Sequence, residues 1–314
     1  MSGLTDQPAD LLTVILDLNP LAWEEVESIE GVTLASVLEA FLIFANAHRA
    51  LRHENAIAVY GATLGSSELL YSSAQTKSST LTASQFSVSR DPSAYQTFRV
   101  LNDSITEGAM RLARSAESNA FIGRHVGIVK ALAKALCHIN RITKENDDKK
   151  NPLKSRILIL SVSGDAPGQY IPMMNCIFSA QKANIPIDVC KIAGDNAVFM
   201  QQAAHLCEGI YYRIEKPQAL IQYLTVIFLP GMYARKLLNL PQQNEVDLRA
   251  ACFCHRKIID IGYVCSVCLS IFCSPIPVCS TCRTKFPMST LKRFIVPKSK
   301  ARMKSANGSA LASS

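Results

Sequence analysis

Short apolar runs alternate along the chain with segments in which apolar residues recur every three or four positions. Leu11 to Leu16 is a continuous apolar run that ends at Asp17, as expected of a central strand covered on both faces. After a stretch that we interpret as a loop, the apolar residues between positions 34 and 45 are spaced as on one face of a helix. These segments predict a first strand followed by a first helix.

The next segments carry weaker signals. Residues 56–60 and 68–71 flank a segment rich in Gly, Thr and Ser, which predicts a hairpin. Two helices are then expected, one over residues 95–114 and one whose apolar stripe, over residues 122–136, includes Val126. We expect both helices to cover the sheet.

The second half of the chain alternates regularly between strand and helix patterns. We expect strands at residues 157–162, 187–192 and 210–214, and helices at residues 171–183, 196–207 and 218–228. Parallel neighbours need crossover connections, so this alternation predicts an α/β fold with a mostly parallel sheet and helices on both faces.

The end of this alternating pattern marks a domain boundary. Pro230 and Gly231 end the last predicted helix, and residues 232–240 predict a short helical connector. We therefore place the boundary near residue 244. The expected domains are a body at residues 8–244, a cysteine-rich zinc module at residues 245–296, and a basic, disordered tail at residues 297–314.

Composition fits a globular protein inside the cell. The chain has 314 residues, 48% of them hydrophobic and 18% charged, which suits one good-sized domain with a small second one. Residues 1–10 contain two acids, no base and no apolar run, unlike a secretory signal. Apolar tracts such as residues 219–229 fall short of the roughly 20 residues of a membrane span. We expect a soluble protein with no membrane contact.

The positive charge is confined to the end of the chain. The formal net charge is +8, and eight bases but no acid follow Asp260. The preceding part is neutral, because 25 bases and 25 acids remain. Such a tail could contact phosphate or an acidic protein. It could equally be a solvated, disordered segment.

Cysteine usage points to a metal. Seven of the eleven cysteines fall between Cys252 and Cys282, and the other four are scattered among apolar residues. A tight cluster in a chain without a secretory signal indicates metal binding in a reducing compartment.

Two Cys-x2-Cys pairs carry the clearest chemical signal. Cys265 and Cys268 are followed, after ten residues, by Cys279 and Cys282. Each pair directs two thiolates at one Zn²⁺, which joins segments that have too little core of their own. Four thiolates fill the tetrahedron and leave no position for a catalytic water. We therefore expect a structural zinc site.

A second group of ligands surrounds this motif and leaves the number of zinc ions at one or two. Cys252, Cys254, His255 and Cys273 could hold a second zinc in a cross-braced, RING-type arrangement, or form a degenerate site filled by packing. The degenerate alternative arises because Ile276 stands where a RING-type ligand is expected. Spacing alone also allows a ribbon, in which Cys252 and Cys254 join Cys265 and Cys268.

Three stretches of the chain carry a recognisable combination of residues. They are Leu12-Thr-Val-Ile-Leu-Asp17-Leu-Asn19-Pro20 with Trp23 nearby, Phe228-Leu-Pro-Gly-Met232, and the cysteine-rich run from Cys252-Phe-Cys-His-Arg through Ile261-Gly-Tyr-Val-Cys-Ser-Val-Cys-Leu-Ser-Ile-Phe-Cys273 to Cys279-Ser-Thr-Cys282. Together they resemble the family of the small von Willebrand A subunit of the general transcription factor TFIIH. The resemblance implies a von Willebrand A-like body and a C4 zinc finger.

The same resemblance implies a site on the first strand. Active von Willebrand A domains hold Mg²⁺ with an Asp-x-Ser-x-Ser motif, and this chain has Asp17-Leu-Asn19-Pro-Leu21 in that place, with Asp165 near the later acidic position. Leu21 cannot bind a hard cation and Asn19 replaces a hydroxyl. We expect a degenerate site of Asp17, Asn19 and Asp165 without Mg²⁺.

The resemblance also implies the function. It indicates a non-catalytic subunit of the TFIIH core in the nucleus, which acts in transcription initiation and nucleotide excision repair and binds the larger, RING-bearing von Willebrand A subunit. We expect only indirect or weak DNA contact, and no catalytic residue, nucleotide motif or small-molecule substrate. The alternatives are a RING-type ubiquitin ligase and a zinc-dependent nucleic-acid-binding module.

Overall fold

The computed structural model places the chain in two compact units, Met1–Leu248 and Arg249–Ser314. It describes residues 9–73, 96–117, 126–146, 153–241, 246–255 and 257–287. The tail predicted at residues 297–314 lies outside this described part.

The first unit is built on a six-stranded sheet of order β3-β2-β1-β4-β5-β6. All neighbouring strands are parallel except β3, which is antiparallel to β2. The strands are β1 (Asp10–Asp17), β2 (Ala56–Thr63), β3 (Ser66–Ser72), β4 (Lys154–Ser161), β5 (Ile187–Lys191) and β6 (Tyr211–Arg213). This confirms the predicted α/β fold, and the hairpin prediction corresponds to β2 and β3.

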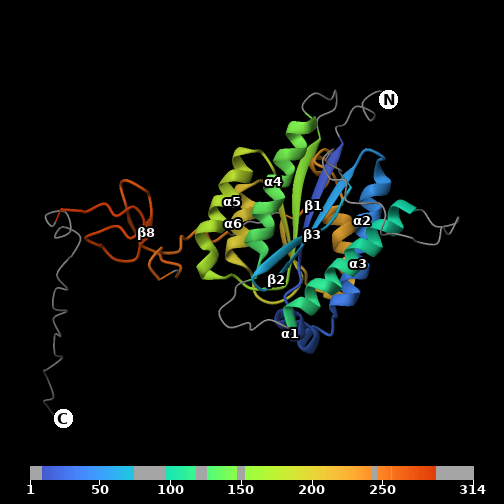
Figure 1. Ribbon diagram of the computed structural model, residues 1–314, viewed down its shortest axis with the longest axis horizontal. Coiled ribbons are helices and arrows are strands. Elements are labelled where there is room, and N and C mark those ends of the chain that lie inside the picture. Colours follow the sequence, from blue (N-terminus) through green and yellow to red (C-terminus); the bar gives the residue numbers. More distant parts are fainter. Residues whose placement is uncertain are drawn as a thin grey trace, which may run out of the picture. The chain divides into compact units, whose positions relative to one another are not determined.

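Helices cover both faces of this sheet. In Figure 1, α4, α5 and α6 lie on one face and α2 and α3 on the other. The helices are α1 (Pro20–Glu30), α2 (Leu34–Leu51), α3 (Gln96–Glu117), α4 (Ile128–Asn146), α5 (Tyr170–Lys182), α6 (Val198–Leu206) and α7 (Leu220–Tyr223), which continues as a π-helical turn (Leu224–Phe228). Short 3₁₀ turns occupy Pro167–Gln169, Pro217–Ala219 and Ala234–Lys236. The second unit contains only the two-residue strands β7 (Tyr263–Val264) and β8 (Ile271–Phe272) among its described residues.

The predicted loop after β1 was wrong, because α1 occupies it. Pro20 stands in the first turn of this helix, and Gly31 ends it in the left-handed conformation at φ 65°. Only Trp23 and Val26 are buried on its inner face, which is too sparse a stripe to show as helical periodicity. The Trp23 indole Nε1 donates to the Asp17 carbonyl at 2.7 Å and fixes the helix to the end of β1.

The predicted helical position of Val126 was also wrong. Val126 forms an isolated bridge with Leu64, and the helix begins two residues later at Ile128. Gly127 separates the two, and a Cβ atom there would lie 2.1 Å from the Ser66 carbonyl oxygen. The close backbone approach therefore requires glycine at this position.

One described helix, α2, is long and apolar enough to cross a membrane by length and composition alone. Its buried residues are Val37, Phe41, Phe44, Ala45 and His48. Phe41 and Phe44 are fully buried in the core that joins α2 to the sheet. One face of α2 thus packs against the sheet, while Ile43 and Leu51 are exposed.

A buried cluster of charges ties the amino-terminal edge of the sheet to the segment after the last helix. Arg156 on β4 is fully buried, and its Nε donates to Asp10 Oδ2 at 2.7 Å. Its Nη1 donates to the Phe228 carbonyl at 2.5 Å. Asp188 on β5, also fully buried, accepts two bonds from Arg235, at 2.8 and 2.6 Å. The connector predicted at residues 232–240 is thus held by charge as well as by packing.

The burial of His48 predicts acid sensitivity. Its Nε2 donates to the Ala56 carbonyl at 3.4 Å, and its Nδ1 has no hydrogen-bond partner in the structure. Burial lowers the pKa of His48 from 6.5 to about 4, and the positive charge of Arg156 adds to the shift. Below pH 6.5 the His48 imidazole therefore binds a proton in the unfolded chain but not in the folded chain. The free energy of unfolding consequently falls as the pH drops from 6.5 towards 4.

We expect His48→Gln to reduce this loss by about 2 kcal/mol between pH 7 and pH 4.5, as measured by urea unfolding. The glutamine amide still provides a donor for the Ala56 carbonyl. His205→Gln on the exposed side of α6 is the control and should follow the wild-type curve. Parallel acid profiles for wild type and His48→Gln would refute the assignment.

Candidate metal centre

Two turns of the same geometry form the centre of the second unit. The first runs from Cys265 to Cys268 and the second from Cys279 to Cys282. After each turn the next backbone N–H, of Leu269 or Arg283, bonds to the carbonyl of the first cysteine at 2.9 Å. Leu269 and Arg283 both adopt positive φ angles, 59° and 60°. Each turn thereby directs its two thiols to the same side.

The four thiols of these turns meet around one point. The sulfurs of Cys265 and Cys282 are 3.7 Å apart, and those of Cys268 and Cys279 are 3.5 Å apart. All four ligand atoms lie within 4.8 Å of one another. Four thiolates at about 2.3 Å from a tetrahedral Zn²⁺ are separated by about 3.8 Å, so the donor set fits this ion.

Two hydroxyl groups support the thiols from outside. Ser270 Oγ lies 3.1 Å from the Cys268 sulfur, and Thr284 Oγ1 lies 3.1 Å from the Cys282 sulfur. Hydrogen bonding from the Ser270 side chain and backbone lowers the pKa of Cys268 to about 6, which favours the thiolate that a metal binds. Sequence reasoning missed both residues. The signal was present, since Cys-Ser-Val-Cys-Leu-Ser and Cys-Ser-Thr-Cys-Arg-Thr place a hydroxyl at the same distance after each pair.

The structure also brings together Cys252, Cys254, His255 and Cys273. The Cys273 sulfur lies 3.4 Å from that of Cys254 and 3.1 Å from His255 Nδ1, and all four ligand atoms lie within 4.8 Å of one another. This is the cross-braced arrangement, and the ribbon pairing of Cys252 and Cys254 with the Cys265 turn is not formed. Ile276 instead packs against the small apolar core of this unit. Three thiols and one imidazole could therefore hold a second metal ion.

The predicted degenerate site lies at the carboxyl end of β1. Asp17 is buried, and its Oδ2 accepts from the backbone N–H groups of Ser163 at 2.8 Å and Val162 at 3.2 Å. Its Oδ1 accepts from the Asn19 N–H at 3.2 Å, and the Asn19 side chain donates to Ser163 Oγ at 3.0 Å. Asp165 faces another element, where it accepts from the Phe199 N–H at the start of α6. Asp17 and Asn19 thus share one polar centre, and Asp165 caps a helix nearby.

Lys191 completes this centre, and sequence reasoning missed it because it reads as the end of a strand. The side chain is buried, and its Nζ donates to the carbonyls of Val162 at 2.7 Å and Ser163 at 2.6 Å. Burial lowers the pKa of Lys191 to about 8, while the carboxylates of Asp17 and Asp165 oppose the shift. At neutral pH the ammonium group is still charged. It therefore places a positive charge beside the carboxylates of Asp17 and Asp165.

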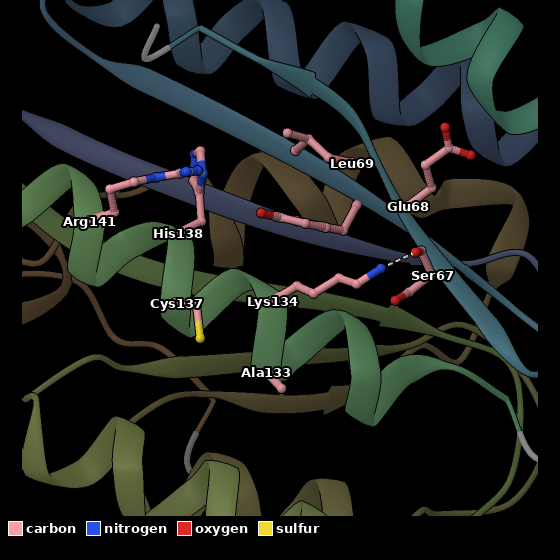
Figure 2. A pocket seen from close by; sticks show the side chains of 9 residues that line it. Ser67, Glu68, Leu69, Ala133, Lys134, Cys137, His138 and Arg141 are labelled. Carbon is pink, nitrogen blue, oxygen red and sulfur yellow. Dashed lines mark hydrogen bonds between the residues drawn. The ribbon is translucent and has the colours of Figure 1, made fainter. Parts of the chain in front are cut away.

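A shallow pocket of about 540 Å³ lies between β3 and α4, and Tyr60, Leu69 and His138 are among the residues that line it. Figure 2 shows Lys134 extending from α4 to the Ser67 carbonyl. One helical turn earlier, Lys130 Nζ donates to the Gly65 carbonyl at 2.7 Å. Two lysines of α4 thus bind the backbone around β3.

The Ser67 carbonyl points away from the rest of the sheet. The carbonyl of its partner residue on β2, Ala62, accepts from the Leu18 N–H, so the N–H and C=O of Ala62 face the β1 side. In an antiparallel pair, the residue opposite such a position turns its own backbone groups outward. Lys134 therefore occupies the outer edge of the sheet.

Comparison with known proteins gives a consistent result. Residues 9–283 match the family model described as Transcription factor Tfb4. The chain is 43% identical over 288 residues to the General transcription and DNA repair factor IIH subunit tfb4 of Schizosaccharomyces pombe, which covers 92% of each chain. It is 36% identical over 282 residues to the TFB4 subunit of Arabidopsis thaliana, which covers 90% of each.

A solved structure covers the first unit. The crystal structure of the TFIIH p34 N-terminal domain superimposes with a TM-score of 0.56 and 30% sequence identity, over 70% of this chain and 97% of that chain. A von Willebrand factor type A protein from Catenulispora acidiphila gives a TM-score of 0.46 at 14% identity, over 69% of this chain and 41% of that chain. The first unit is thus similar in fold to the TFIIH p34 N-terminal domain, and its mostly parallel sheet with helices on both faces is the α/β arrangement that the sequence predicted.

Proposed function

Because this chain belongs to the Tfb4 family of TFIIH subunits, we propose that it is a non-catalytic scaffold subunit of the TFIIH core. In this role it acts in the nucleus, in RNA polymerase II transcription initiation and in nucleotide excision repair. Its main partner is the larger, RING-bearing von Willebrand A subunit, and any DNA contact is indirect. The proposed domains are residues 8–244, 245–296 and 297–314, the last a basic tail.

The observation that carries the proposal is the closed carboxyl edge of the sheet. In open α/β sheets, ligands bind outside the carboxyl ends of the strands. Here the acceptor atoms of Asp17 are taken by three backbone N–H groups, and Lys191 occupies the neighbouring carbonyls. The place where this fold would bind an ion or a substrate is thus filled by the chain itself. The first unit would therefore act through its outer surface, by binding other proteins, as a scaffold does.

We further propose that the second unit binds two Zn²⁺ ions that act only as structural supports. The first is held by Cys265, Cys268, Cys279 and Cys282, and the second by Cys252, Cys254, His255 and Cys273. Supporting this, each group supplies four ligand atoms of the types that structural zinc sites use. With four protein ligands, neither ion has an open position for water.

Reconstitution tests the scaffold role. The other core subunits of TFIIH, co-expressed with and without this chain, should yield a stable assembly only when it is present, as measured by size-exclusion chromatography. The purified chain alone should hydrolyse neither ATP nor peptide. An assembly that forms equally well without the chain would overturn the proposal.

Because the carboxyl edge of the sheet is occupied by Lys191, we expect Mg²⁺ to have no effect on the stability of the first unit. Millimolar MgCl2 should leave the thermal unfolding midpoint of the wild-type chain unchanged, because Lys191 already supplies the positive charge. Lys191→Met should destabilise the first unit by about 1 to 3 kcal/mol, because two buried carbonyls lose their donor and Asp17 loses a countercharge. Differential scanning fluorimetry with and without MgCl2 measures both effects. Stabilisation of the wild type by Mg²⁺ would contradict the assignment.

A second candidate function is favoured by the cross-braced ligand groups, which are the arrangement of RING-type ubiquitin ligases. An autoubiquitination assay with the purified full chain, ubiquitin, activating enzyme and a panel of conjugating enzymes distinguishes the two functions. Ubiquitin chains that depend on Cys265 would support the ligase. Their absence, with zinc bound, would support the scaffold.

A further inference from the structure

Leu269 has a left-handed backbone conformation, which is unfavourable for a residue with a branched side chain. Its φ angle is 59°, in the left-handed region where glycine is the ordinary residue and a branched side chain is rare. The side chain is 71% exposed, so packing within the unit does not explain its retention. Unfavourable backbone conformations that persist tend to cluster at functional positions.

Three other exposed aliphatic residues precede Leu269 in the sequence. Ile261 is 77% exposed, Val264 59% and Val267 63%. We call these three residues and Leu269 the aliphatic patch. All four belong to the nine-residue stretch that leads into and through the first cysteine turn, and Val264 pairs with Ile271 across β7 and β8. A small unit with little core has no folding reason to expose so much apolar surface.

The core of the unit is a separate set of residues. Cys265, Phe272 and Cys279 are buried together, with Phe253, Ile276 and Phe286 packed around them. In the second cysteine turn, Arg283 occupies the corresponding place at φ 60°. The two turns share a backbone geometry but present different surfaces, one apolar and one basic.

Charge identifies the kind of occupant. The described part of this unit has four bases, Arg249, Lys257, Arg283 and Lys285, and one acid, Asp260, which pairs with Arg249 at 2.7 Å. A second copy of this chain would bring like charges together, which disfavours self-association. Phosphate backbones offer nothing to four aliphatic side chains. An acidic protein surface with an apolar centre complements both features.

We propose that the aliphatic patch docks an apolar surface bordered by acidic side chains on another protein subunit, and that Leu269 is one of its contact residues. The proposal rests on the scaffold function, because it assigns the zinc module one of the contacts that a scaffold must make. The metal-braced turn holds Leu269 rigidly, so little side-chain and backbone freedom is lost on binding.

The test uses the two positive-φ positions as a matched pair. Leu269→Gly and Arg283→Gly both relieve the same backbone conformation, but only the first removes an aliphatic side chain. The full-length variants are assayed against the co-expressed other core subunits of TFIIH by biolayer interferometry. We expect about a tenfold weaker affinity for Leu269→Gly and an affinity close to wild type for Arg283→Gly. Zinc content and resistance to a chelator should stay unchanged or rise in both variants.

Val267→Ser tests the patch independently, because Val267 does not have a positive φ angle and the substitution removes only an aliphatic side chain. We expect it to weaken binding several-fold. Higher salt should also weaken wild-type binding, since acidic groups border the partner's surface. Affinity unchanged in Leu269→Gly, or zinc lost from it, would overturn the proposal. A wild-type chain that fails to join the assembly would instead contradict the scaffold function.

Discussion

Asp188→Asn should lower the free energy of unfolding of the first unit by about 3 to 5 kcal/mol, because it leaves buried guanidinium groups without their countercharge. Asp188 is fully buried and accepts two bonds from Arg235. Its Oδ2 also lies 3.8 Å from Arg156 Nη1. In the variant Asp10, which is partly exposed, would remain as the acidic side chain described near the two cations. Urea unfolding followed by far-UV circular dichroism measures the loss.

An exposed ion pair in the same unit supplies the control. Glu68 accepts from Arg111 at 2.7 Å, but both side chains are largely exposed. Glu68→Gln should therefore cost less than about 1 kcal/mol. Equal effects of the two substitutions would show that the buried cluster contributes no more than a surface pair.

Cys265→Ser should have an even larger effect, confined to the second unit. Binding energies of structural zinc are about 10 to 16 kcal/mol in small peptides, which exceeds what the few apolar contacts of this unit supply. We expect the variant to lose one of two zinc ions, to lose the ordered geometry of the two Cys-x2-Cys turns, and to keep the first unit folded. Metal analysis by inductively coupled plasma spectrometry and limited proteolysis measure these outcomes.

Two further cysteines make the zinc experiment specific. Cys137→Ser removes an exposed thiol of α4 that belongs to neither ligand group, and it should leave the zinc content unchanged. Cys273→Ser should remove the other zinc ion. If Cys265→Ser retains two equivalents of zinc, or if the purified wild type is folded and free of metal, the structural role is wrong.

Most of the sheet and its helices could be predicted because buried elements leave periodic patterns. β1 and β4 are buried on both faces and read as continuous apolar runs, while α2 shows one apolar face. α1 escaped detection because only two of its side chains are buried. The start of α4 was misplaced because Gly127 is required by a backbone contact with β3, which no local pattern reports.

The candidate sites were predictable in part for a similar reason. Spacing identified the ligand types. The fold, however, decides that Cys273 lies beside His255, and not beside Cys268, which is closer to it in the sequence. Lys191 was hidden because a lysine at the end of a strand is ordinarily solvated. Its role depends on Val162 and Ser163, which are some 30 residues away in the sequence and meet it only across neighbouring strands.

The two lysines of α4 that bind the backbone around β3 affect how easily the sheet could aggregate with other molecules. An unpaired strand at the border of a sheet is a template on which a strand of another molecule can add, and uncontrolled addition leads to aggregation. Lys134 occupies the Ser67 carbonyl and Lys130 the Gly65 carbonyl, so an incoming strand would meet charge where it needs acceptors. These bonds should therefore disfavour the addition of a strand from another copy of the chain at the start of β3.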